Sequence, residues 1–220
     1  LDSMLNTRDL ANARILLDNM TRRYGALREL QLRRAELMAR DSKPIDALAI
    51  NGALLEEYPE WGPAVTHRAS LVLMAFMQDP ARGEQFLRAA NTYAIQATQL
   101  TPGSLNAWEI LAKSSSIARD YPTALRAYAR CVELSPNAPR FRATQADLMI
   151  ANGQHQQAEA LLREIEYLFG KTIDTELVQI RLLALSGRKD EAIILLSRCR
   201  KMAPNHPGVQ QASQQLLGRP

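Results

Sequence analysis

The sequence has few cysteines, few runs of β-branched residues and no long apolar run, and each shortage excludes a class of protein. Two cysteines without a CxxC pair do not make a disulfide framework. The longest apolar candidate, SLVLMAFM at Ser70–Met77, is far shorter than the roughly 20 residues that span a membrane. Without β-branched runs a β-sheet is not expected. The first ten residues, LDSMLNTRDL, lack the basic and apolar segments of a signal peptide.

Good helix formers dominate the composition instead: Ala, Leu, Arg and Gln are all abundant. Hydrophobic residues make up 46% and charged residues 23% of the chain, which suffices for a sizeable buried core. The net charge of +4 is a mild basic bias and not the dense basic stripe of a nucleic-acid binder. We therefore expect an all-α protein.

Two series of residues recur along the chain with a fixed spacing. Six alanines each follow a break and begin a second helix, and four of their five intervals are 34 residues long, the exception being 43: Ala13, Ala47, Ala90, Ala124, Ala158 and Ala192. A Pro or Gly stands twelve residues after each alanine, where it ends that helix: Gly25, Pro59, Pro102, Pro136, Gly170 and Pro204. A period of this length indicates a solenoid of helix hairpins.

One repeat has a recognisable sequence pattern: Trp108, Leu111, Ala112, Ala124, Tyr128 and Pro136. This unit resembles the tetratricopeptide (TPR) repeat, W-x2-L-G-x2-Y, then A-x3-F, then P, except that Ser115 replaces the tyrosine of the first helix. Four further units match in part, so the resemblance covers nearly the whole chain. The resemblance implies a right-handed α-solenoid of stacked antiparallel helix hairpins, the TPR superhelix. The Ala- and Arg-rich composition of the chain resembles that of bacterial TPR arrays.

The period predicts a single solenoid over residues 1–220. Its hairpins are expected at residues 1–27 (partial), 28–61, 62–104, 105–138, 139–172 and 173–206, followed by a capping helix at 207–220. Leu1 falls in the middle of a first helix, so we expect the array to continue N-terminally in a longer protein. The last segment, PGVQQASQQLLG, is either a polar cap or the first helix of another repeat.

The hairpin at 62–104 is nine residues longer than the others, and the extra length falls around MQDPARGEQF. We expect both of its helices to extend by about one turn, with Asp79–Gly83 as the tip. Two interpretations stay open. The insertion is either a tolerated loop or a protruding contact surface.

No sequence motif of catalysis is present: there is no P-loop, GxGxxG, HExxH or GxSxG. His67, His155 and His206 are not at metal-ligand spacing from one another or from cysteine. Cys131 and Cys199 occupy the same repeat position two units apart, too far for a disulfide, and we expect buried thiols. We therefore expect no enzyme activity, no cofactor and no metal.

The resemblance also implies a binding surface, because the first helices of TPR hairpins line a concave groove that holds partner peptides or helices. His67 is expected to face this groove. The predicted groove residues are Glu36, Ser70, Asn106, Glu109, Lys113, Arg140, Asp147, Asp174 and Arg181, flanked by Glu29, Leu32, Thr66, Leu73 and Leu177. Their mixed character suggests a partner with polar and apolar features. The residue set that clamps chaperone C-termini is not reproduced, since Glu109 and Asp147 stand where that set has a Lys and an Asn.

The sequence favours a non-catalytic protein-interaction scaffold that binds a protein or peptide in the groove. The alternative is a TPR docking segment of a larger cell-envelope export, pilus or exopolysaccharide-secretion protein, which by analogy favours the periplasm or cell envelope. RNA binding by a helical repeat is a third hypothesis, disfavoured by the TPR anchors, so no nucleic acid and no membrane insertion are expected, while self-association is allowed. A basic cluster, interpreted as a solvated face or as a patch for an acidic partner, comprises Arg22, Arg23, Arg28, Arg33, Arg34, Arg40 and Lys43.

Overall fold

The computed structural model describes residues 9–41 and 43–218, and every regular element in these ranges is helical. The elements are α2 (Leu10–Tyr24), α3 (Arg28–Arg40), α4 (Pro44–Glu57), α5 (Gly62–Gln78), the short 3₁₀ helix η1 (Pro80–Arg82), α6 (Glu84–Leu100), α7 (Leu105–Ile117), α8 (Tyr121–Leu134), α9 (Pro139–Ala151), α10 (His155–Phe169), α11 (Ile173–Leu185), α12 (Lys189–Met202) and α13 (Pro207–Leu217). The predicted helix before residue 9 lies outside the described residues. The chain divides into two compact units, residues 1–120 and 121–220, which we describe separately.

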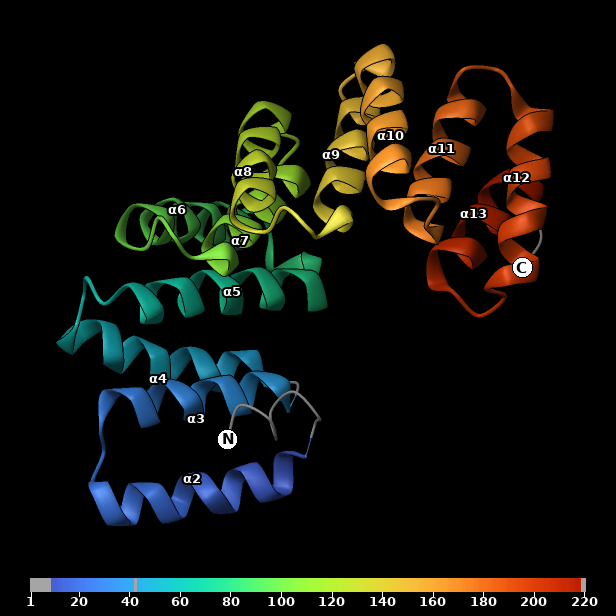
Figure 1. The fold of residues 1–220 in the computed structure, drawn as a ribbon. Helices are drawn as coiled ribbons and strands as arrows, with labels where there is room; N and C mark the ends of the chain where they lie inside the picture. Colours follow the sequence, from blue (N-terminus) through green and yellow to red (C-terminus); the bar gives the residue numbers. More distant parts are fainter. Residues whose placement is uncertain (1–8, 42, 219–220) are drawn as a thin grey trace. The chain divides into compact units, whose positions relative to one another are not determined.

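Unit 1 contains α2 to α7 (Figure 1). Helix α3 packs against α4, and α5 packs against α6, as antiparallel hairpins. Among the first helices of successive hairpins, α5 contacts both α3 and α7. They therefore form one layer of the unit.

Unit 2 contains α8 to α13. Helices α9 and α10 form one hairpin and α11 and α12 the next, and α9 contacts α11. Helix α13 packs against both α11 and α12. Each unit thus repeats the same arrangement of paired helices, and the expected all-α helical-repeat fold is confirmed.

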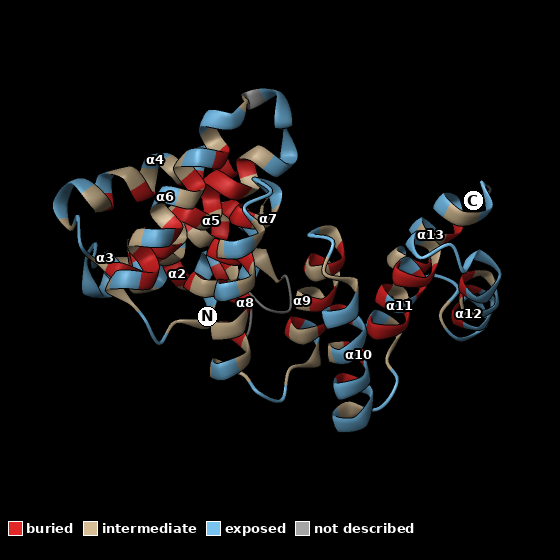
Figure 2. Ribbon diagram, turned by 90° about the horizontal axis from the view of Figure 1, so that it is seen from above, coloured by how far each residue is buried: buried red, intermediate tan, exposed pale blue. Residues whose placement is uncertain are grey.

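The anchor alanines explain how neighbouring helices approach so closely. All six alanines of the 34-residue series are fully buried. Buried residues form stripes along the inner faces of the helices, and exposed residues cover the outer faces (Figure 2). A methyl group at each crossing point lets the backbones pack together, and this requirement repeats once per hairpin.

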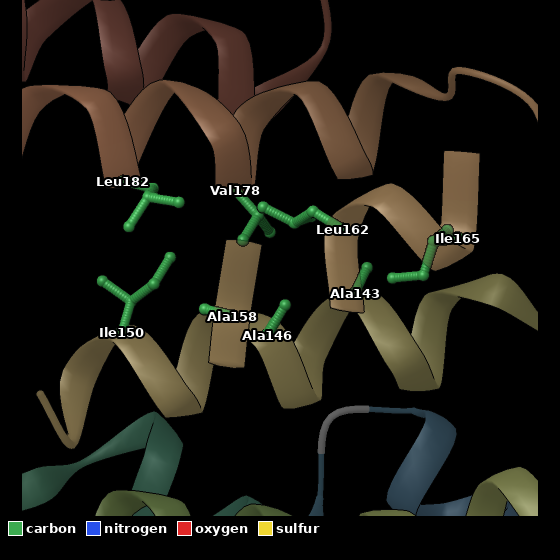
Figure 3. Packing of buried hydrophobic residues seen from close by; sticks show 8 residues of the cluster. All are labelled: Ala143, Ala146, Ile150, Ala158, Leu162, Ile165, Val178 and Leu182. Atoms are coloured by element: carbon green, nitrogen blue, oxygen red, sulfur yellow. The ribbon is translucent and has the colours of Figure 1, made fainter. Parts of the chain in front are cut away.

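In the core of unit 2, two successive hairpins share one apolar cluster. A single cluster joins side chains of α9, α10 and α11 (Figure 3): Ala143, Ala146, Ile150, Ala158, Leu162, Ile165, Val178 and Leu182. The small residues lie on α9 and α10, while α11 supplies Val178 and Leu182 from the following hairpin. The apolar face of one hairpin is therefore covered by the next.

Helix ends follow the local sequence. Gly25 and Gly170 cap α2 and α10 with φ of 79° and 75°, a conformation in which a side chain is strained. Pro44 begins α4 and Pro122 is the second residue of α8, where a missing backbone N–H costs nothing.

Two residues at TPR pattern positions, Trp108 and Ser115, form side-chain hydrogen bonds. Trp108 is only partly buried, and its indole N–H donates to the Pro102 carbonyl oxygen at 2.8 Å. Ser115, which replaces the pattern's tyrosine, is fully buried, and its hydroxyl lies 3.2 Å from Asn91 Oδ1 on α6. A buried hydrogen bond to the neighbouring helix therefore stands where an aromatic ring is usual.

Both cysteines are free and buried, as expected. Burial raises the pKa of the Cys199 thiol, and its sulfur donates to Glu176 Oε2 at 3.1 Å. A protonated, hydrogen-bonded thiol fits packing better than redox chemistry. Among the described residues, no helix is long and apolar enough to cross a membrane.

Candidate functional site

The face formed by α3, α5 and α7 in unit 1 carries two adjoining hollows. The first, which we call the polar hollow, has a volume of about 510 Å³ and is lined by Glu29, Leu32, Arg33, Glu36, Trp61, Pro63, Thr66, His67, Ser70, Thr101, Ser104 and Asn106. The second, the methionine hollow, has a volume of about 400 Å³ and is lined by Ser70, Leu73, Met74, Met77, Gln78, Asn106, Glu109, Ile110 and Lys113. Ser70 and Asn106 belong to both, so the two hollows form one continuous groove.

The backbone positions these side chains by helical periodicity. Glu36 on α3, Ser70 on α5 and Lys113 on α7 hold the same position in three successive hairpins. Residues three or four apart on a helix share a face, so each first helix presents a short polar row to the groove. Because α3, α5 and α7 are neighbours, the rows lie side by side.

The charged groups of the groove are paired within unit 1. Arg33 Nη1 lies 2.7 Å from Glu36 Oε2, and Lys113 Nζ lies 2.6 Å from Glu109 Oε1. Glu29 accepts from Arg28 at 2.9 Å, and this hydrogen bond holds the pKa of the Glu29 carboxyl below its usual value. The groove therefore carries charges of both signs, and each of these charges has an opposite charge of the protein beside it.

One aromatic ring, that of Trp61, lines the polar hollow just before α5. The Arg28 guanidinium lies 4.8 Å from the ring centre of Trp61 and 5.3 Å from that of Tyr58. The two rings meet edge to face, with 6.4 Å between their centres. Arg28 therefore packs on both rings and supports the Trp61 side chain from behind the groove wall.

His67 lines the polar hollow, as predicted, and its ring is partly buried. Its Nδ1 atom is buried without a hydrogen-bond partner. Burial lowers the pKa of His67 to about 4, and the nearby Arg33 guanidinium acts in the same direction. The ring is therefore neutral at neutral pH.

The predicted groove residues divide between the two units. Unit 1 brings Glu36, Ser70, Asn106, Glu109 and Lys113 together around the two hollows. The flanking Leu32, Thr66 and Leu73 are buried in the floor. Whether these residues bind a partner stays a prediction.

The four predicted residues of unit 2 contact side chains of their own unit. Arg181 Nη1 lies 2.5 Å from Asp147 Oδ1. Asp174 Oδ1 lies 3.9 Å from His206 Nε2, and the Arg140 guanidinium stacks at 4.3 Å on the Phe141 ring. The charges of Arg181 and Asp147 are therefore already paired, and a partner would have to compete for them.

Sequence reasoning did not identify Met74 and Met77 as groove residues. Both lie in SLVLMAFM, which was interpreted only as too short to span a membrane. The available signal was the insertion directly after them, because a longer α5 needs additional side chains facing the groove. Met77 is 62% exposed.

Unit 2 has a more enclosed hollow of about 360 Å³ among α10, α11 and α12. Three ion pairs surround it, Arg163 with Glu159, Lys171 with Glu166, and Arg188 with Glu191, at 2.7, 3.1 and 2.6 Å. Its wall comes mainly from the second helix α10 and the first helix α11, and α12 contributes Glu191. It therefore lies between a second helix and a first helix, and not on a face lined by first helices alone.

The basic cluster near the start of the chain is largely paired. Arg34 contacts Asp18 at 3.3 Å and Lys43 contacts Asp41 at 3.2 Å, besides the pairs of Arg28 and Arg33 already described. Arg23 lies 5.3 Å from the Tyr24 ring centre. This supports the interpretation as a solvated, charge-paired surface. No group of three or more potential metal ligands is found in the described part of the chain.

Comparison with known proteins identifies the repeat. A family profile described as Tetratricopeptide repeat matches residues 117–171. No curated protein matches the sequence. The fold is similar to a solved structure described as functional characterization of Pseudomonas aeruginosa pilF, with 15% identity, a TM-score of 0.72 and coverage of 97% of this chain and 93% of that one.

Two further solved structures share the fold. YrrB, described as a TPR protein with an unusual peptide-binding site, is 15% identical with a TM-score of 0.66, covering 90% of this chain and 97% of that one. TTC0263, a thermophilic TPR protein of Thermus thermophilus, is 17% identical with a TM-score of 0.62, covering 88% and 100% of the two chains. These likenesses concern the fold.

Proposed function

Because the chain is a tetratricopeptide-repeat protein, we propose that it is a non-catalytic scaffold that binds a segment of a partner protein in the α3–α5–α7 groove. The observation that carries the proposal is the continuity of the two hollows through Ser70 and Asn106. Both hollows combine apolar surface with polar lining groups, and a continuous groove of this kind suits an extended peptide segment better than a compact metabolite. YrrB provides a precedent for a TPR protein with a peptide-binding site.

The energetics favour a modest, selective interaction. Paired charges at the rim contribute little affinity, so the binding energy must come from apolar contacts and from hydrogen bonds to uncharged groups. The packed helices that carry the groove residues reduce the ordering cost on the scaffold side. A short peptide would therefore bind in the micromolar range, about −8 kcal/mol.

The test uses a phage library of random twelve-residue peptides, selected against the full 220-residue chain. Ser70→Arg fills the junction of the two hollows with a long cationic side chain. Ser197→Arg is the matched control, because Ser197 is exposed on α12 in unit 2. We expect enriched peptides to lose at least tenfold in affinity for Ser70→Arg and to keep their affinity for Ser197→Arg, measured by fluorescence anisotropy.

Circular dichroism and thermal unfolding establish that both variants are folded. Peptides that bind the parent and the Ser70→Arg variant equally would place binding outside the groove. A selection that enriches no sequence would also contradict the proposal.

A further inference from the structure

Helix α5 is longer than its counterparts by one turn. The other first helices, α3, α7, α9 and α11, have 13 residues each, whereas α5 has 17. Its partner α6 also has 17 residues, compared with 14 or 15 for α4, α8, α10 and α12. The insertion thus extends both helices of the hairpin as regular helix, with η1 at the tip.

The additional turn carries side chains into the groove. Counted from Gly62, residues beyond the thirteenth are Ala75–Gln78, and of these Met77 and Gln78 line the methionine hollow. Leu73 and Met74 continue the apolar lining on α5, and Ile110 faces them from α7. Without the insertion, α5 would end near Met74, and the hollow would lack Met77 and Gln78.

An exposed methionine in a hollow is suited to contact with a partner. Met77 is 62% exposed although it lies beside the buried Leu73. Methionine is unbranched and polarisable, so it adapts its shape to different apolar side chains. The hollow's volume of about 400 Å³ lies within the range of ligand-binding sites and accommodates one large apolar side chain with its backbone.

The charges around the groove determine what kind of segment fits. Arg33 with Glu36, Lys113 with Glu109 and Arg28 with Glu29 are each paired at 2.9 Å or less. A charged side chain of a partner would lose its hydration without meeting an uncompensated opposite charge. The complementary face is therefore uncharged, with hydroxyl, amide or backbone groups opposite Ser70 and Asn106.

We infer that the nine-residue insertion builds an anchor site. The methionine hollow takes one leucine-, isoleucine-, methionine- or phenylalanine-type side chain from an uncharged segment of a partner protein. This inference rests on the proposed function of the groove and names the partner's chemistry. It gives the insertion a contact role inside the groove, which differs from both the tolerated loop and the protruding surface.

The test uses the peptides enriched by phage display on the parent chain. Met77→Glu places a carboxylate in the hollow, and Met202→Glu is the matched control, since Met202 is 64% exposed on α12. Met77→Ala shortens the side chain without adding charge and serves as the second variant. We expect at least tenfold weaker binding by Met77→Glu, a three- to tenfold loss by Met77→Ala and no change by Met202→Glu.

Two further readouts concern the peptide itself. Alanine scanning of the peptide should find one apolar position whose substitution costs at least tenfold. Affinity should change less than about threefold between 50 and 500 mM NaCl, because no net charge is neutralised at the contact. A steep salt dependence or a dominant charged position would overturn the inference.

The variants separate this inference from the proposed function. Loss of binding by Ser70→Arg together with full binding by both Met77 variants would overturn the anchor site and leave groove binding in place. Full binding by all three variants would overturn both. Loss by Ser70→Arg and by Met77→Glu, with Met202→Glu unaffected, is the result that supports both.

Discussion

Asp147 and Arg181 lie 34 residues apart, at the same position of two successive hairpins, and form an ion pair with 2.5 Å between Oδ1 and Nη1. The period that places both in the predicted groove also places them opposite each other, because α9 and α11 are neighbours. In a helical-repeat protein, equivalent positions of successive repeats are natural contact partners. Opposite charges at two equivalent positions therefore pair with each other and hold the two hairpins together. A ligand that binds either charge has to break this pair.

This pair predicts a small, separable effect on stability. Arg181→Glu places two carboxylates together, but both side chains are partly exposed, so the cost should be about 0.5–1 kcal/mol. The charge-swapped variant, Asp147→Arg with Arg181→Asp, should restore most of it. Urea unfolding of the parent, Arg181→Glu, the single variants Asp147→Arg and Arg181→Asp, and the swap measures the coupling. A swap as unstable as Arg181→Glu would show that the pair contributes nothing.

The 34-residue period was enough to identify the anchor alanines of this fold. Ala13, Ala47 and Ala192 follow from spacing, and each is fully buried, because a close helix crossing leaves room for only a methyl group. Packing at positions that depart from the pattern could not be foreseen. Ser115 forms a hydrogen bond to Asn91 on α6, and nothing near Ser115 in the sequence indicates which helix supplies the acceptor.

The sequence predicts which side chains face the candidate groove, but not every ion pair that these side chains form. The resemblance to TPR hairpins predicts Ser70 and Asn106 on the groove face, and both residues line the two hollows. Spacing within a helix also allows the Lys113–Glu109 pair. The Asp147–Arg181 pair depends on how two hairpins stack, and the methionine hollow depends on where the insertion ends α5.

Overpacking at an anchor alanine should be costly. Ala158→Leu on α10 adds three carbon atoms to a fully buried position within the cluster of Figure 3, and a loss of about 1–3 kcal/mol is expected. Ala160→Leu on the same helix is the control, because Ala160 is exposed, and it should change stability by less than about 0.5 kcal/mol. Chemical denaturation measures the free energy of unfolding of both variants and of the parent. Equal effects at both positions would contradict the role of the anchor series.

One turn contains a side chain where glycine fits better. Arg119 has φ of 60°, and the residues one and two periods later, Gly153 and Gly187, have φ of 76° and 78°. An L-residue in this region is strained by roughly 1 kcal/mol, so Arg119→Gly should stabilise the protein by about 0.5–1 kcal/mol. Gly187→Ala should destabilise it by a similar amount through backbone strain alone, since no atom lies within 4 Å of an added Cβ. Destabilisation by Arg119→Gly in thermal unfolding would indicate a compensating contact.

Stability should fall as the pH is lowered from 7 to 5, because of His67. Burial lowers the pKa of His67 in the folded state to about 4, against 6.5 for the unperturbed group. Between these values the unfolded chain binds more protons than the folded one, so acid favours unfolding. The expected loss attributable to this residue between pH 7 and pH 5 is about 2 kcal/mol.

His67→Gln removes the titrating group, so its unfolding free energy should decline less between pH 7 and pH 5, by about 2 kcal/mol, than that of the parent. Arg33→Gln removes the second cause of the shift, which should raise the folded-state pKa of His67 and reduce the pH dependence in part. NMR titration of the His67 ring measures that pKa directly, and urea unfolding at each pH measures the stability. If the parent and His67→Gln show the same pH dependence, His67 is not the buried neutral group that the polar hollow indicates. If His67→Gln reduces the pH dependence of stability and Arg33→Gln leaves the pKa of His67 unchanged, burial alone lowers that pKa.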